Sequence, residues 1–287
     1  MALDQIDVDK VNVREDGSIE DTEMSFIDHL ESLRWHVVRA VLSILIFTIA
    51  TFLFKGFVFD TLIFGPTKLD FPTYRGLCAL SEALSLGNML CIEKLNLRFI
   101  NIEMAGQFLV HLKVSFVFGF VMGFPYTLWE LWKFIRPGLY QKEIRYTRGI
   151  VFFSSLLFFL GVSFGYFILT PFAINFFSNY QVSELVSNDF TLTNYVSFLT
   201  MFVLASGLIF ELPMLVYFLS KIGLLTPGMM REYRRHAVVA ILAVSAVITP
   251  ADVGTMLLVF VPVYFLYEIS IFISASVAAK IEEELNS

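Results

Sequence analysis

A single carboxylate, Glu143, lies among four cations in the short polar segment 133–145, between two long apolar stretches. The cations are Lys133, Arg136, Lys142 and Arg145. A carboxylate binds a guanidinium group through paired, charge-assisted hydrogen bonds, which makes it a suitable receptor for arginine side chains. The pattern therefore indicates that Glu143 recognises a positively charged peptide.

Glu211 is a second carboxylate in an unusual place, within the apolar run Leu208-Ile209-Phe210-Glu211-Leu212-Pro213. A carboxylate that faces lipid costs at least ~2.5–3.5 kcal/mol, so Glu211 faces a cavity or a partner, or it is protonated. Pro213 leaves a backbone carbonyl without its helical donor and favours a kink nearby. Two interpretations remain: a polar cavity for a substrate, or a structural hydrogen bond to another span.

Asp252 follows Thr249-Pro250 in a turn between two apolar segments. In that position it caps the following helix, or it joins Glu211 as an intramembrane polar group that binds a partner. The chain has no His-Glu-x-x-His, Gly-x-Ser-x-Gly or P-loop motif, and its four histidines are scattered. We therefore expect no enzymatic activity, no cofactor, no metal site and no nucleic-acid partner.

The elements that position these residues are predicted to be membrane-spanning helices. The chain of 287 residues is 57% hydrophobic and 16% charged, whereas soluble domains carry about 25% charged residues. The apolar runs are long and lack the alternation of a membrane β-barrel. The sequence thus predicts an all-α polytopic membrane protein with six spans, at 35–54, 108–131, 149–172, 195–219, 236–248 and 255–273.

Lysine and arginine counts in the short connectors predict the orientation of these spans. The connectors 132–148 and 220–235 are basic, whereas 173–194 and 249–254 contain no lysine or arginine. The basic pair is therefore expected in the cytoplasm, which also places both termini there. The loop 55–107 is then external despite its charges, because charge in long loops contributes less to orientation.

The fifth and sixth spans are predicted to be short. Residues 237–248 would form only ~18 Å of helix against a hydrocarbon core of ~30 Å, and Glu268 interrupts the sixth span. Such a pair implies a locally thin bilayer, although short helices also occur inside larger bundles. In the external loop, Cys78 and Cys91 form either a disulfide or two free thiols.

Three domains are expected along the chain. Residues 1–24 form an acidic, disordered cytoplasmic tail without the apolar region of a cleavable signal peptide. Residues 25–275 form the membrane domain, which begins with an amphipathic helix at 26–35, and residues 276–287 form a cytoplasmic tail. Helical spacing of the apolar residues predicts that first helix. Its polar face offers Asp28, His29, Glu31, Ser32 and Arg34.

Several motifs follow one another over roughly residues 25–275. They are His29-Leu30-x-x-Leu33-Arg34, Gly65-Pro66, Trp132-x-Phe134-x-x-Pro137-Gly138-Leu139-Tyr140-x-x-Glu143, Phe210-Glu211-Leu212-Pro213, Thr249-Pro250-x-Asp252 and Leu266-Tyr267-Glu268. In their order and spacing they resemble the TatC family, the multispanning subunit of the twin-arginine protein translocase. The resemblance implies a curved, glove-like bundle in the cytoplasmic (inner) membrane.

The resemblance also implies a function: recognition of twin-arginine signal peptides on folded cargo, at the cytoplasmic face. Glu143 matches the family's loop acid, and Phe134, Pro137 and Tyr140 would shape the loop around an arginine. The family's N-terminal motif has Glu where this chain has Ser32, with Glu31 beside it and Arg34 retained. Either Glu31 substitutes for the missing acid, or Glu143 carries more of the binding.

By the same resemblance, Glu211 faces the transmembrane helix of a small single-span subunit of the TatA or TatB type. Export would be driven by the proton-motive force, the protein would self-associate, and membrane lipid would surround it. The alternative from the residues alone is an ion-coupled small-solute transporter that uses Glu211 as its proton site.

Overall fold

The computed structural model describes residues 26–85, 87, 91, 92, 94, 95, 97–135, 147–183, 188–249 and 253–286. Its helices are α1 Phe26–Leu53, α2 Lys55–Phe57, α3 Pro72–Ala83, α4 Gly106–Ile135, α5 Thr147–Phe164, α6 Thr170–Asn179, α7 Leu192–Ile209, α8 Leu212–Lys221, α9 Pro227–Glu232, α10 Arg234–Ile248 and α11 Val253–Asn286. π-helical turns occupy Val58–Ile63 and Gly165–Leu169, and a 3₁₀ turn occupies Gly65–Thr67. The strands are β1 Arg98–Ile100 and β2 Asp189–Thr191.

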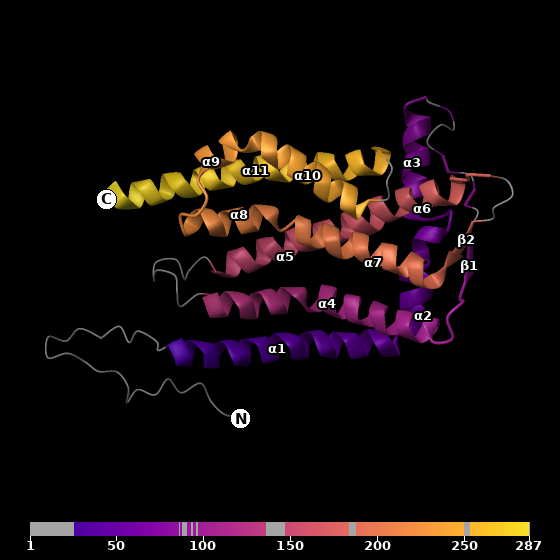
Figure 1. Cartoon of the computed structure of the whole chain (residues 1–287), viewed down its shortest axis with the longest axis horizontal. Helices are drawn as coiled ribbons and strands as arrows, with labels where there is room; N and C mark the ends of the chain where they lie inside the picture. Colours follow the sequence, from indigo (N-terminus) through magenta and orange to yellow (C-terminus); the bar gives the residue numbers. More distant parts are fainter. Residues whose placement is uncertain are drawn as a thin grey trace.

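The long helices run side by side along the long axis of the molecule (Figure 1). At one end of the bundle, α1 and α5 begin and α4 and α11 end. Helix α9 also lies there, and we call this the α9 end. The opposite end carries α3, β1 and β2, and we call it the strand end. The core lies between the helices: Phe124 of α4 stacks on the fully buried Phe158 of α5, with ring centroids 3.6 Å apart. The bundle therefore brings the start of α1 and the end of α4 to the same end of the molecule.

Five helical stretches within the described residues are long and apolar enough to cross a membrane: Leu33–Leu53, Gly106–Phe134, Gly149–Asn179, Leu192–Lys221 and Val253–Glu283. The remaining predicted span corresponds to α10, which has 15 residues and a length of ~22 Å. The prediction that the fifth span is short is therefore confirmed.

The prediction that the sixth span is short was wrong, because α11 continues for 34 residues. Glu268 does not interrupt it. Its Oε1 lies 2.9 Å from Nε of Arg234 on α10 and accepts a 2.8 Å hydrogen bond from the Tyr264 hydroxyl. A paired and hydrogen-bonded carboxylate is tolerated inside an apolar helix, so the helix passes through this position.

The predicted fourth span is broken at Phe210-Glu211, between α7 and α8. Pro213 lies in the first turn of α8, where its missing N–H needs no helical partner. The break agrees with the expected effect of this proline. It also places Glu211 at a helix junction instead of on a continuous helical surface.

Close packing of α1 against α4 depends on two glycines spaced four residues apart, Gly119 and Gly123. A Cβ atom at Gly119 would lie 2.8 Å from the carbonyl oxygen of Ile44, closer than real Cβ contacts. Small residues at this spacing let helix backbones approach each other in membranes. The glycine pair therefore holds α1 tightly against α4.

The strand end contains a pair of strands that the sequence did not predict, and a disulfide that the sequence left as one of two alternatives. β1 pairs with β2 in a parallel two-stranded ladder, with Phe99 opposite Phe190. Cys78 of α3 and Cys91 are joined by a disulfide, with Cα atoms 4.4 Å apart. The buried Tyr74 hydroxyl donates to the carbonyl oxygen of Pro66 at 2.9 Å, and burial raises the pKa of this phenol above its usual value. β1, which lies between α3 and α4 in the chain, thus pairs with the distant β2 at this end.

Candidate functional site

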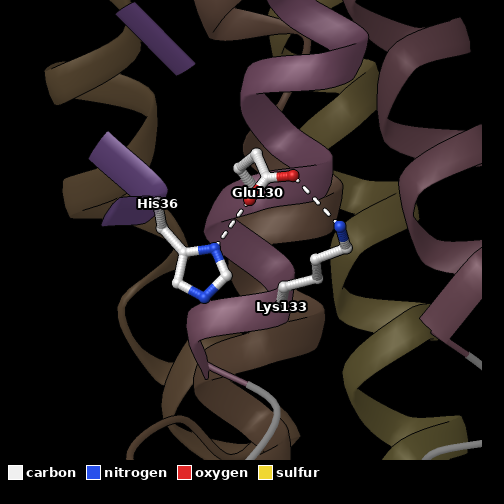
Figure 2. Close-up of polar contacts among 3 residues, drawn as sticks. All are labelled: His36, Glu130 and Lys133. Carbon is white, nitrogen blue, oxygen red and sulfur yellow. Dashed lines mark hydrogen bonds and ion pairs between the residues drawn. The ribbon is translucent and has the colours of Figure 1, made fainter. Parts of the chain in front are cut away.

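Glu130 is the most deeply buried carboxylate in the described part of the chain, with 1% of its side chain exposed. Its Oε2 lies 2.6 Å from Nδ1 of His36 on α1, and its Oε1 lies 3.0 Å from Nζ of Lys133 on α4 (Figure 2). The imidazole donates from Nδ1 to the carboxylate, in either the neutral Nδ1–H form or the imidazolium. Both carboxylate oxygens therefore have donors, one from each helix.

The helical geometry explains why these three side chains meet. Lys133 follows Glu130 by three residues, so the two side chains lie on one face of α4. Close packing of α1 on that helix brings His36 to the same face. An ionised carboxylate that is buried needs a paired charge and hydrogen bonds to offset its lost hydration. The network consequently fixes the first turns of α1 against the last turns of α4.

Three of the predicted recognition residues lie around this network at the α9 end. Phe134 is half-buried in the last turn of α4, with its ring centroid 6.4 Å from that of His36. Glu31 and Arg34 are exposed on α1, and the Arg34 guanidinium lies 5.5 Å from the centroid of the Trp35 ring. The structure therefore brings Phe134 next to α1 and leaves Glu31 and Arg34 accessible.

Other predicted site residues fall outside the described part of the structure. They are Pro137, Tyr140, Glu143 and Asp252. Ser32 belongs to α1, but its side chain is not among those described. The first three of these residues belong to the segment that joins the end of α4 to the start of α5, and both of those helix ends lie at the α9 end.

Glu211 lies apart from this group, at the junction of α7 and α8. Ser154 of α5 donates a hydrogen bond to its Oε2, whereas its Oε1 is buried and has no hydrogen-bond partner in the described structure. The structure thus contains the structural hydrogen bond to another span that was one of the two interpretations from the sequence. Oε2 makes the structural hydrogen bond to another span, and Oε1 has unused capacity for a partner.

Sequence reasoning missed Glu130 and His36. Glu130 lies inside the predicted second span, 108–131, so the rule that singled out Glu211 applies to it equally. His36 was not singled out, because it is the second residue of the predicted first span, 35–54, and so lies close to the membrane interface. Among the described residues, no group of three or more His, Cys, Asp or Glu side chains could hold a metal ion.

Comparison with known proteins identifies the family. Residues 28–262 match the family described as Sec-independent protein translocase protein (TatC). The chain belongs to the TatC family. The family resemblance read from the sequence motifs is therefore confirmed, and the chain is a multi-pass membrane protein of the twin-arginine protein translocase.

Relatives cover nearly the whole chain. The TatC protein of Blattabacterium sp. subsp. Periplaneta americana (strain BPLAN) is 38% identical over 262 residues, which is 91% of this chain and 98% of the relative. The TatC protein of Aquifex aeolicus (strain VF5) is 30% identical over 261 residues, which is again 91% of this chain and 98% of the relative. These lengths show that the similarity extends across the membrane domain.

Two crystal structures of the twin-arginine translocase receptor TatC share the fold. The first is 28% identical in sequence to this chain, with a TM-score of 0.63. The match covers 87% of this chain and 99% of the chain in that structure. The second, in DDM, is 30% identical in sequence, with a TM-score of 0.67. The match covers 86% of this chain and 99% of the chain in that structure. The predicted all-α, TatC-like fold class is thus confirmed.

Proposed function

We propose that this TatC protein recognises twin-arginine signal peptides of folded cargo at the α9 end of its bundle. We infer that this end faces the cytoplasm, with both termini on that side of the inner membrane and the 55–107 loop outside. Translocation is an activity of the family, and family membership favours it over the ion-coupled transporter. The proposal also includes scaffolding of small single-span subunits, self-association and export driven by the proton-motive force.

The observation that carries the proposal is the His36–Glu130–Lys133 network. It connects the helix that bears Glu31 and Arg34 to the helix that leads into the Glu143 segment. A bound peptide that touches both segments needs them at a fixed separation, because every degree of freedom lost on binding lowers affinity. Glu130 is thus a positioning residue, while Glu143 and Glu31 are the groups proposed to contact the arginines.

Replacing Glu143 by alanine is expected to weaken binding of a twin-arginine peptide by tenfold or more. A hydrogen bond to a charged group contributes roughly 1.5–3 kcal/mol, and ~1.4 kcal/mol corresponds to a factor of ten. The measurement is a titration of purified, full-length protein in detergent with a fluorescent peptide. A peptide carrying two lysines in place of the arginines should bind the wild type and the variant almost equally weakly.

Lys142→Ala is the matched control, because it alters the same segment without removing a carboxylate. It should leave binding unchanged or strengthen it slightly by removing a like charge. Equal affinity of the wild type and Glu143→Ala for the twin-arginine peptide would remove Glu143 from the site. The double change Glu31→Ala with Glu143→Ala then measures whether Glu31 has taken the role that Ser32 cannot fill.

A further inference from the structure

An apolar cavity of about 220 Å³ opens between α4, α5 and α7, within the candidate membrane spans. Its walls include Val117 and Val121 of α4, Val162 of α5, and Leu199 and Val203 of α7. Apolar cavities of this size do not hold ordered water, because water needs two to four polar partners. Hydrocarbon is therefore the matching occupant.

Of the three polar side chains that line the cavity, two are already hydrogen-bonded within the protein. The Thr200 hydroxyl donates to the carbonyl oxygen of Val196 at 2.7 Å, and the Tyr166 hydroxyl donates to that of Leu62 at 2.8 Å. Ser163 is exposed at the rim. An occupant thus needs no hydrogen-bonding groups along the cavity, which fits an acyl chain.

Lys113 lies one helical turn from Val117, toward the strand end of the cavity. Its Nζ donates a 2.8 Å hydrogen bond to the Ser197 hydroxyl of α7, and the side chain is exposed. No carboxylate forms an ion pair with Lys113 in the described part of the chain. A single neutral oxygen leaves two ammonium hydrogens and a full positive charge available to a ligand.

The position of Lys113 along α4 lets its side chain reach the level of the lipid phosphates. The 30-residue helix is ~45 Å long and exceeds the ~30 Å hydrocarbon core by ~7 Å at each end if it is centred. Lys113 lies about 10 Å from the helix start, which is ~3 Å inside that boundary. A lysine side chain extends to the interface from such a depth.

We propose that this cavity and Lys113 form a binding site for an anionic phospholipid of the leaflet at the strand end. One acyl chain occupies the cavity, and the lipid phosphate accepts hydrogen bonds from the Lys113 ammonium above it. The site is separate from the peptide site at the opposite end of the bundle and does not depend on the function proposed for that end.

Native mass spectrometry of the full-length protein tests the site. The protein in detergent is titrated with phosphatidylglycerol or with phosphatidylcholine of identical acyl chains. The wild type should bind phosphatidylglycerol about fivefold more tightly than phosphatidylcholine. This factor corresponds to the ~1 kcal/mol that one basic residue contributes near an anionic lipid. Lys113→Gln should abolish this preference. Ser163→Trp, which fills the rim, should weaken binding of both lipids.

Lys68→Gln is the matched control, since Lys68 is also exposed and donates to one neutral oxygen, the carbonyl of Asp60, but does not lie on a helix that lines the cavity, as Lys113 of α4 does. It should retain the wild-type preference. The proposal is overturned if the wild type binds both lipids equally, if Lys113→Gln keeps the preference, or if Lys68→Gln abolishes it to the same extent.

Discussion

Replacing Glu130 by leucine is expected to lower the stability of the protein by ~3 kcal/mol. Removing one partner of a buried ionic group leaves the others without compensation, which typically costs 3–5 kcal/mol. The lower value applies because Lys133 is 42% exposed and His36 is 17% exposed, so water can partly replace the carboxylate. Unfolding of the purified protein in detergent, followed by tryptophan fluorescence, measures the loss.

Two further variants test the cause of this loss. Glu130→Gln retains an oxygen that accepts a hydrogen bond, so its stability should lie between those of the wild type and Glu130→Leu. Glu268→Leu also removes a paired carboxylate, but Glu268 is 25% exposed and its partner Arg234 is 45% exposed. The free energy of unfolding of that variant should fall by only ~1 kcal/mol, as is typical for ion pairs that are accessible to solvent. Equal losses at Glu130 and Glu268 would contradict the role given to burial.

The Glu130 variants should also affect recognition in a way that stability alone does not explain. If the network sets the separation of α1 and the α4 end, Glu130→Gln should weaken twin-arginine peptide binding under conditions in which the protein remains folded. Glu268→Leu, placed on α11, should leave peptide binding unchanged. If a Glu130 variant stays folded and binds the peptide normally, the network only packs α1 against α4 and does not position the peptide site.

Replacing Glu211 by alanine is expected to abolish most protein export and co-purification of the single-span subunits, with peptide binding intact. The buried Oε1 has no hydrogen-bond partner in the described structure, so it is the atom available to a partner helix. Hydrogen bonds between helices in membranes contribute ~1–2 kcal/mol. The corresponding loss of subunit affinity is roughly 5- to 30-fold, measured by quantitative co-purification.

Ser154→Ala is the matched control for Glu211. It removes the hydrogen bond to Oε2 while the carboxylate stays in place. If Glu211 serves only to bond α5, Ser154→Ala should reproduce the effect of Glu211→Ala. If Oε1 binds a partner helix, subunit co-purification should survive Ser154→Ala and fall with Glu211→Ala. Normal export by Glu211→Ala would assign the residue to packing.

Features that depend on composition and local chemistry were predictable from the sequence. The apolar runs predicted the helical membrane bundle, and the short run at 236–248 predicted the short α10. Pro213 predicted a kink, because a proline cannot donate the helical hydrogen bond, and the structure has the break between α7 and α8 at this place. In each case, the residues within one segment were sufficient to predict the structure of that segment.

Features that depend on contacts between distant segments were not predictable in this way. β1 and β2 have three residues each, too few for an alternating pattern, and each forms only because the other lies beside it. Glu130 and His36 are 94 residues apart and meet because Gly119 lets α1 approach α4. The length of α11 was underestimated because the Arg234 partner that neutralises Glu268 belongs to another helix.

A crosslinking map of a twin-arginine peptide tests most directly whether the α9 end is the recognition surface. Photo-reactive residues would be placed one at a time at positions 26–35 and 133–148, and at matched positions on α3 at the strand end. Adducts should form in both segments of the α9 end, depend on the two arginines, and be absent from α3. Adducts confined to α3, or equal labelling by a peptide with two lysines, would contradict the proposed function.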